Sequence, residues 1–265
     1  MTKVTVVVPT FNKAAFIKHT LASVYAQTFK DWQLLVIDDG STDETVSIVR
    51  RCIDPNRTQV ITRKNNTGIC HVLNDALERI QTKYFIQLDG DDWIEPDTVQ
   101  VLFKTMELQP ATTALAYANT CHWHEKDGHF YVHKLVKHRP FQDRYDFAVY
   151  DPMVQPRFYR TKSVKRVGGW EIDNLTKGRM MEDRRMLLRL LDDHTFTYVD
   201  RNLYHFRYHQ HNLSHDRNAA VYNKLRLLYT QKALKRWGNH YQACAVGPSD
   251  LWQSIRLVPI SQRRE

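Results

Sequence analysis

Asp89, Gly90, Asp91 and Asp92 form the acidic cluster of the sequence that is best suited to chemistry. The cluster follows residues 84–88, an apolar run whose aromatic and β-branched side chains predict a buried strand. A buried carboxylate must be paired, hydrated or bound to a metal, and glycine lets a ligand approach the backbone closely. Oxygen ligands of this kind suit Mg²⁺ or Mn²⁺. We therefore expect a divalent-cation site here; the alternative is a solvated turn whose acids cap the next helix.

Two further polar clusters follow predicted strands in the first half of the chain. They are residues 9–12 (Pro-Thr-Phe-Asn) and 38–41 (Asp-Asp-Gly-Ser). Parallel strands end at one edge of a sheet, where open α/β folds bind their ligands. Such an edge suits a nucleotide, with its base and ribose against Thr10, Phe11 and Asp39 and its diphosphate near the acidic cluster. Taken singly, Phe11 reads better as a core ring and Asp39 as a turn residue, but the repeated placement favours a site.

Strands and helices alternate four times in the first 110 residues. Strands are predicted at 4–8, 32–37, 60–62 and 84–88, and helices at about 15–27, at 42–52 and from residue 69 to about 80. This alternation predicts βαβ units and a mostly parallel sheet. The glycine fingerprint of a dinucleotide site is absent after the first strand.

The pattern changes after residue 110. We expect a strand at 114–119, a hairpin at 122–136, a weakly patterned segment at 137–160, a helix at 182–191, short strands at 195–199 and 203–208, and a basic amphipathic helix at about 217–237. A long irregular segment in a compact domain is often a functional loop. The basic side chains of 137–160 read as a solvated surface or as a guide for an anionic acceptor: His138, Arg139, Arg144, Arg157 and Arg160.

The composition is that of a globular protein with an affinity for anions. The 265 residues are 42% apolar and 25% charged, with a net charge of +9. Nucleic acid, anionic lipid and nucleotide substrates all fit this charge, which does not choose among them. No run of 18 apolar residues predicts a transmembrane helix, and the strand at Val4 leaves no room for a signal peptide. The four cysteines are scattered, so we expect reduced thiols in a cytoplasmic protein.

Seven short motifs occur in a fixed order along residues 4–214. They are Val-Val-Val-Pro-Thr-Phe-Asn (6–12), Asp-Asp-Gly-Ser-Thr-Asp (38–43), Asn66-x-Gly68, Asp-Gly-Asp-Asp (89–92), Gly-Gly-Trp (168–170), Glu182-Asp183, and Arg207-x-His209 with Leu213-Ser214. In this combination the sequence resembles the family 2 glycosyltransferases, whose fold is GT-A. The resemblance covers nearly the whole first 215 residues.

The resemblance implies the fold and its division. It implies an α/β GT-A fold with a Rossmann-like, mostly parallel central sheet flanked by helices, a small acceptor-side subregion and a C-terminal helix. The glycosyltransferase domain would span 1–215, with a nucleotide-binding half at 1–110 and an acceptor-binding half at 111–215. Residues 216–265 would form a C-terminal helical extension.

The resemblance also implies an activity. Family members transfer a sugar, with inversion, from a nucleotide-diphosphate donor to an acceptor. Here the donor would be UDP-linked, and the acceptor a hydroxyl of a glycan, a lipid-linked glycan or a protein. Mn²⁺ or Mg²⁺ would be bound by Asp91 and His209. The residues implied in donor binding are Pro9, Thr10, Phe11, Asn12, Asp39, Arg63, Asn66, Gly68, Asp89, Gly90 and Arg207.

The acceptor side carries the implied base. The family pattern places the general base at Asp183, with Glu182 orienting the acceptor or the loop; the alternative is that both acids simply complement a helix dipole. Trp170 is expected to stack on an acceptor ring, or else to anchor the core. Two other functions compete: a sugar nucleotidyltransferase, which would need a glycine-rich phosphate loop, and a non-catalytic nucleotide-sugar or nucleic-acid binding module. Binding of nucleic acid is the less favoured expectation.

The sequence does not decide which surface the basic C-terminal helix contacts. Its charge pattern is typical of a helix on a membrane surface, so peripheral association with the inner membrane surface is one expectation. Packing against its own domain, or against a second copy in a homo-oligomer, is equally compatible with the sequence.

Overall fold

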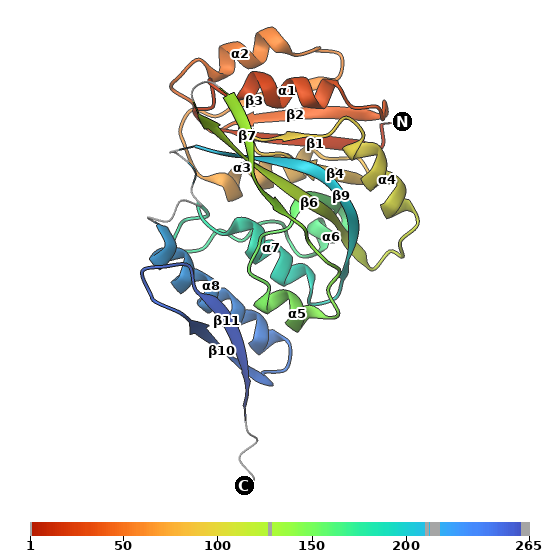
Figure 1. Ribbon diagram of the computed structural model, residues 1–265. Coiled ribbons are helices and arrows are strands. Elements are labelled where there is room, and N and C mark those ends of the chain that lie inside the picture. Colours follow the sequence, from red (N-terminus) through yellow and green to blue (C-terminus); the bar gives the residue numbers. More distant parts are fainter. Residues whose placement is uncertain (1, 127–128, 210–211, 213–217, 261–265) are drawn as a thin grey trace.

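A large curled sheet flanked by helices forms the centre of the molecule (Figure 1). The computed structural model describes residues 2–126, 129–209, 212 and 218–260. Its first half contains β1 (Val4–Thr10), α1 (Ile17–Tyr25), β2 (Trp32–Asp38), α2 (Thr45–Cys52), β3 (Thr58–Thr62), α3 (Ile69–Arg79) and β4 (Tyr84–Gln87). β1 pairs in parallel with both β2 and β4, and β2 pairs in parallel with β3. The predicted βαβ units are therefore confirmed.

The second half continues the same sheet with mixed pairing. It contains β5 (Trp93–Ile94), α4 (Thr98–Glu107), β6 (Thr113–Lys126), β7 (His129–Val136), α5 (Arg144–Val149), β8 (Gln155–Arg160), α6 (Thr161–Arg166), α7 (Glu182–Leu190) and β9 (Thr195–Tyr208). The strand order is β3-β2-β1-β4-β8-β6-β9-β5, with β7 paired to β6. β8 is antiparallel to β4 and β6, whereas β9 is parallel to β6. The parallel sheet is thus limited to the first half and to the β6–β9 pair.

Two predictions for this half are corrected. Residues 137–160, expected to be irregular throughout, contain the helix α5 at 144–149 and the strand β8 at 155–160, which pairs with β4 and β6. The two short strands expected at 195–199 and 203–208 form the single strand β9, which follows β6 along most of its length. The polar Asp200 and Arg201 between them form a bulge within the strand, because Ala118 of β6 lies opposite Val199 and the next residue, Asn119, lies opposite Asn202.

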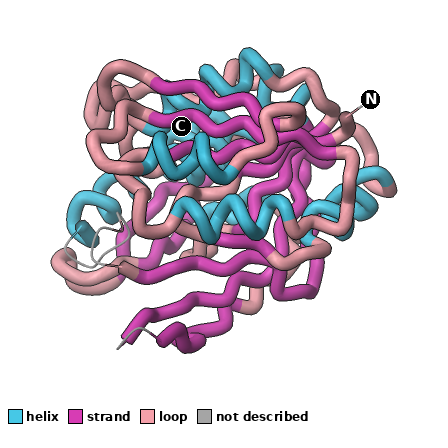
Figure 2. Tube along the Cα trace, turned by 90° about the horizontal axis from the view of Figure 1, so that it is seen from above, coloured by secondary structure: helices cyan, strands magenta, loops and turns pink. Residues whose placement is uncertain are grey.

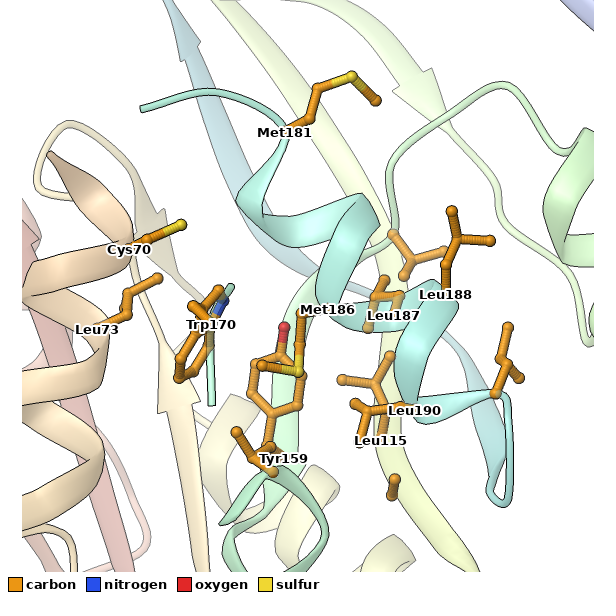
Figure 3. Packing of buried hydrophobic residues seen from close by; sticks show 14 of the residues in the cluster. Cys70, Leu73, Leu115, Tyr159, Trp170, Met181, Met186, Leu187, Leu188 and Leu190 are labelled. Carbon is orange, nitrogen blue, oxygen red and sulfur yellow. The ribbon is translucent and has the colours of Figure 1, made fainter. Parts of the chain in front are cut away.

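Helices cover both faces of the sheet, as Figure 2 shows from above. Side chains of a strand alternate between its two faces. On β1, Val7 packs into a core that includes buried residues of α3 and α7, while Val6 and Val8 pack into a second core that includes residues of α1 and α4. Figure 3 shows part of the first core, where Met186, Leu187 and their neighbours on α7 face Tyr159.

The C-terminal segment contains more than the predicted helix. After α8 (Ala219–Arg236) the chain forms an antiparallel hairpin of β10 (Tyr241–Val246) and β11 (Ser254–Pro259). α8 packs against α7, and its Arg226 and Arg236 pair with Asp151 at 2.6 Å and Asp192 at 2.8 Å. Part of its basic face is therefore occupied by the domain itself. In the described part of the chain, no helix combines the length and apolar character that crossing a membrane requires.

The turn after β2 depends on glycine. Gly40 has φ +77°, and a Cβ there would lie 2.8 Å from the backbone carbonyl carbon of Asn65. An L-residue in the left-handed conformation costs roughly 1–2 kcal/mol. We expect Gly40→Ala to lower the free energy of unfolding by more than this, because the added Cβ also displaces the neighbouring loop. Denaturant unfolding measures this loss.

Gly168→Ala is the matched control. Gly168 also has φ +77°, but the nearest atom to its added Cβ is a side-chain nitrogen of Arg189 at 3.9 Å. The two variants share the backbone cost and differ in the close contact. Equal destabilisation of the two would show that the Gly40 turn and the 65–66 loop are not in contact.

Candidate functional site

The three polar clusters meet at the carboxyl ends of β1, β2 and β4. Asp39 donates its backbone N–H to the carbonyl of Thr10 over 2.9 Å. Gly90 lies against the same loop, because a Cβ on it would be 3.0 Å from Oγ1 of Thr10 and 3.3 Å from the carbonyl of Pro9. Thr10 Oγ1 is itself buried and has no hydrogen-bond partner among the described residues. The predicted common edge is therefore present.

The loop after β1 is shaped by Asn12 and leaves Phe11 at the surface. Asn12 has φ +50° and accepts a hydrogen bond from Thr42 N at 2.9 Å, while its own N–H donates to Ser41 Oγ at 2.8 Å. Phe11 is 38% exposed. Its ring is therefore free to meet a ligand, and the interpretation of Phe11 as a core residue is wrong.

Asp39 joins this edge to the loop before α3. Its carboxylate accepts hydrogen bonds from Thr67 N at 3.0 Å, Thr67 Oγ1 at 2.9 Å and Gly68 N at 2.8 Å. Arg63 lies beside it, with Nε 3.6 Å from Asp39 Oδ1 and Nη1 2.7 Å from Asp75. The carboxylate thus fixes the position of Gly68 as well as lining the edge.

The same loop contacts the segment that leads into α7. Arg179 Nη2 donates to the carbonyl of Asn66 at 3.0 Å, and Nη1 also contacts the Asn66 side chain. Cys70 N donates to the carbonyl of Gly178 at 3.0 Å. The 176–181 segment, which the sequence analysis did not assign to the site, therefore connects its donor side with its acceptor side.

Asp91 is held between the side chains of Lys13 and His209. Lys13 Nζ lies 2.5 Å from Asp91 Oδ2, and His209 Nε2 lies 2.9 Å from the same oxygen. Burial alone would raise the pKa of Asp91, but the hydrogen bond from His209 and the charge of Lys13 outweigh it and lower this pKa to about 2. Asp91 and His209 are brought together as predicted. Lys13 was missed, although it directly follows the 9–12 cluster.

The residues present fit a divalent cation whose coordination is completed by a bound substrate. Among the described residues, no three His, Cys, Asp or Glu side chains are arranged to hold a metal on their own. Mg²⁺ and similar ions are commonly bound by one or two protein ligands plus substrate phosphates. Asp91 with His209 supplies such a pair, and the unpartnered Thr10 Oγ1 adds a polar atom beside the loop.

Arg207 lies behind the acidic cluster and is 4% exposed. Its Nε donates to the carbonyl of Asp91 at 3.0 Å, and its guanidinium lies 4.7 Å from the ring centre of Phe130. Its backbone N–H donates to Asp92 at 2.9 Å, and Asp92 also accepts from Tyr204 OH at 2.7 Å. Arg207 and Asp92 therefore fix the shape of the loop from its buried side. A direct contact of Arg207 with the donor stays a prediction.

A buried arginine connects the donor side with the acids of α7. Arg157 on β8 has a side chain only 2% exposed; its Nη2 lies 3.1 Å from Asp89 Oδ2 and its Nη1 3.0 Å from Asp183 Oδ2. The interpretation of Arg157 as part of a solvated basic surface is therefore wrong. Its burial follows from its place on β8, whose strand neighbours on both sides are central.

Glu182 and Asp183 begin α7. The preceding Met181 has φ +55°, a conformation that L-residues rarely adopt, and this turn directs both acids toward Arg157. Asp183 keeps 21% of its side chain exposed. Burial and the charge of Asp183 raise the pKa of Glu182 to about 8. Glu182 therefore carries a proton near neutral pH, while Asp183 is paired with a cation; the two neighbouring acids differ in environment.

Trp170 requires a correction. It is 3% exposed, and its ring packs against Phe85 and Tyr159 with centroids 6.2 Å and 6.1 Å away (Figure 3). A ring with no open face cannot stack on a sugar. Trp170 is the core anchor of the alternative interpretation, and the assignment to acceptor binding is wrong. His211 and the Leu213-Ser214 motif lie outside the described residues.

The described residues contain a hollow that none of these acids lines. It lies between the amino-terminal ends of β2 and β3 and is lined by Trp32, Arg57 and Arg79 among others. Parallel strands place their ligand sites at the opposite, carboxyl ends. We therefore assign the candidate site to the edge that carries Asp39, Asp91 and Asp183.

Known proteins resemble the chain in sequence. The family model described as glycosyl transferase family 2 matches residues 5–168. Glycosyltransferase GlyA of Streptococcus pneumoniae serotype 4 is 28% identical over 228 residues, which cover 80% of this chain and 31% of GlyA. Chondroitin synthase of Pasteurella multocida is 33% identical over 114 residues, covering 43% of this chain and 12% of the synthase. The chain thus spans less than a third of the length of these relatives.

Solved structures resemble the fold. S. aureus TarS 1–349 in complex with UDP-GlcNAc has a TM-score of 0.67 and 18% identity, covering 86% of this chain and 66% of that one. The mannosyltransferase PcManGT from Pyrobaculum calidifontis, in complex with GDP-Man and Mn²⁺, has a TM-score of 0.61 and 17% identity, covering 94% of this chain and 66% of that one. The family match extends over more than half of the chain, and so the chain belongs to glycosyl transferase family 2 and has the GT-A fold of these enzymes.

Proposed function

We propose that the chain is an inverting, metal-dependent glycosyltransferase that moves a sugar from a nucleotide-diphosphate donor to an acceptor hydroxyl. The observation that carries the proposal is the continuous set of contacts around one edge of the sheet. Asp39 contacts Thr10, Asp91 contacts His209, and Arg157 contacts both Asp89 and Asp183. A cation-binding acid and an acid suited to take a proton thus belong to one site.

The donor would lie along the ends of β1, β2 and β4. Phe11 offers an exposed ring to a base, and Asp39 and Asp89 offer carboxylates to base and ribose. Asp91 and His209 would hold Mn²⁺ or Mg²⁺. When bound, this ion would neutralise the charge that develops on the departing diphosphate. Lys13 is close enough to Asp91 to add positive charge on the same side.

The acceptor would approach from the side of α7. Asp183 would take the proton of the attacking hydroxyl, on the face opposite the leaving diphosphate. This single displacement inverts the anomeric carbon and needs no covalent link between sugar and enzyme. Protonated Glu182 could donate a hydrogen bond to the acceptor or to the loop. The halves 1–110 and 111–215 would then correspond to donor and acceptor binding.

The donor nucleotide is proposed to be UDP. TarS was solved with UDP-GlcNAc and PcManGT with GDP-Man, which supports a nucleotide sugar and leaves the base to be tested. The acceptor would be a glycan, lipid-linked glycan or protein hydroxyl. We place the enzyme in the cytoplasm, and the exposed Lys224, Lys232 and Lys235 of α8 suit contact with an anionic inner membrane surface. A homo-oligomer formed through the C-terminal segment is also proposed.

A thermal-shift screen tests this proposal. The protein is heated with UDP-, GDP-, CMP- and dTDP-sugars, each with and without Mn²⁺. A ligand at 100 times its Kd adds about 2.7 kcal/mol to the free energy of unfolding, so we expect a raised melting temperature with UDP-sugars that depends on Mn²⁺. If nucleic acid raises the melting temperature and no nucleotide sugar does, the proposal of a binding module replaces that of a transferase.

A further inference from the structure

Arg157 contacts acids from two different parts of the chain. Asp89 follows β4 on the donor side, and Asp183 belongs to α7 on the acceptor side; the two are bound by different nitrogens of one guanidinium at 3.1 Å and 3.0 Å. The side chain is 2% exposed, and its Nε is buried without a hydrogen-bond partner among the described residues. The two terminal nitrogens of the guanidinium each bind one of these two carboxylates.

The chemistry of the guanidinium group makes this contact specific. It is planar, always charged, and presents its donors in a rigid fork, whereas a lysine ammonium is a point charge on a flexible stem. A rigid fork fixes the separation and the relative orientation of two carboxylates. Lysine at this position would keep the charge and lose this fixed geometry. The same strand carries Arg160, whose guanidinium bonds instead to the carbonyls of Thr113 and Pro110, so the bridge is particular to Arg157.

We propose that Arg157 is a positioning residue that links the donor-side Asp89 to Asp183, so that the base is held where the bound donor needs it. The inference rests on the proposed function, because it assigns Asp183 the role of base. Arg157 does not touch the reacting atoms. It acts by fixing one carboxylate relative to the other across the two halves of the site.

The surroundings of Asp183 support this dependence on Arg157. On the same helix, Glu182 directly precedes Asp183. The titratable and charged groups that face Asp183 from its own and other elements are Glu182, Arg184, Arg157, Tyr159, Asp89, Cys70 and Tyr222. Among these, Arg157 and Arg184 are the cations, and the guanidinium of Arg184 bonds to the carbonyls of Tyr150 and Asp151. Arg157 therefore remains the guanidinium that binds the Asp183 side chain.

A double-mutant cycle tests the proposal. Arg157→Gln, Asp183→Asn and the double variant are compared in kcat and in donor KM, with UDP affinity in Mn²⁺ measured by calorimetry. A displacement of a catalytic group by about 1 Å costs about 100-fold in rate, so we expect Arg157→Gln to lower kcat by about that factor. The loss should vanish in the Asp183→Asn background, because there is no base left to position. Arg157→Lys should recover melting temperature but not kcat.

Arg185→Gln is the matched control for burial. Arg185 is also 2% exposed and pairs with Asp173 at 2.6 Å, away from the site acids. We expect a similar fall in melting temperature, and any loss of kcat should be the same with and without Asp183. The proposal would be overturned if Arg157→Gln lowered kcat equally in the wild-type and Asp183→Asn backgrounds, or if Arg157→Lys fully recovered kcat. A wild-type protein that binds no UDP would instead refute the proposed function.

Discussion

Asp91→Asn is expected to abolish metal-dependent transfer and Mn²⁺ binding while leaving the protein folded. Asp91 is ionised throughout the physiological range, because His209 and Lys13 outweigh the effect of burial and lower its pKa to about 2. Asparagine keeps the shape and removes the negative charge, which is the main attraction for a cation at this position. Altering even the residues that support a metal ligand costs about 10–100-fold in affinity or activity, so loss of the ligand itself should exceed this. Paramagnetic resonance of Mn²⁺ with UDP measures the binding.

Asp97→Asn provides the control for Asp91→Asn. Asp97 lies six residues further along the chain and pairs on the surface with Arg201 at 2.8 Å. A surface ion pair contributes about 0–1 kcal/mol, so this variant should bind Mn²⁺ and transfer sugar like the wild type. Undiminished Mn²⁺ binding by Asp91→Asn would show that the cation is held elsewhere or is not used.

Asp183→Asn is expected to slow transfer strongly and to spare donor binding. A positioned general base contributes about 10²–10⁴-fold to a rate, and asparagine cannot accept the proton. The side chain lies on the α7 side of the site, where it is bridged to Asp89 through Arg157 and does not contact Asp91 directly. We therefore expect kcat to fall by about 10²–10⁴-fold, with little change in UDP affinity. Initial rates of UDP release, with calorimetry of UDP in Mn²⁺, separate the two effects.

Glu182→Gln is the informative comparison for Asp183→Asn. Burial raises the pKa of Glu182 to about 8, so glutamine resembles its protonated form near neutral pH. We expect a smaller loss of kcat than in Asp183→Asn. If the order is reversed, and Asp183→Asn transfers normally, the base is Glu182 and the assignment to Asp183 fails.

The donor side could be predicted because its signals are local in sequence. Residues 89–92 place a glycine and three acids directly after an apolar strand, and other polar clusters follow β1 and β2 at 9–12 and 38–41. Parallel pairing then brings the strand ends together without further information. The same logic failed for the second half, where β8 is antiparallel to both of its neighbours and the register between β6 and β9 shifts along the strands.

The contacts that complete the site could not be predicted because they are long-range. Arg157 meets acids 68 and 26 residues away, and Lys13 meets an acid 78 residues away. Nothing near Arg157 in the sequence distinguishes it from the exposed Arg139 or the half-buried Arg144 of the same segment. The prediction that Trp170 stacks on an acceptor was wrong for a related reason. A glycine-rich motif suggests an exposed loop, but the indole is buried in the core that also contains residues of α7.

The central claim is that one edge of the sheet binds a nucleotide diphosphate and a cation opposite a proton acceptor. A crystal structure with UDP and Mn²⁺ tests it most directly, because the anomalous signal of manganese locates the ion. We predict the manganese beside Asp91 and His209, the diphosphate next to it, the uracil between Phe11 and Asp39, and the side chain of Asp183 facing the space where the sugar would lie. Manganese and UDP bound at another surface, or UDP bound with Asp183 facing away from it, would contradict the account.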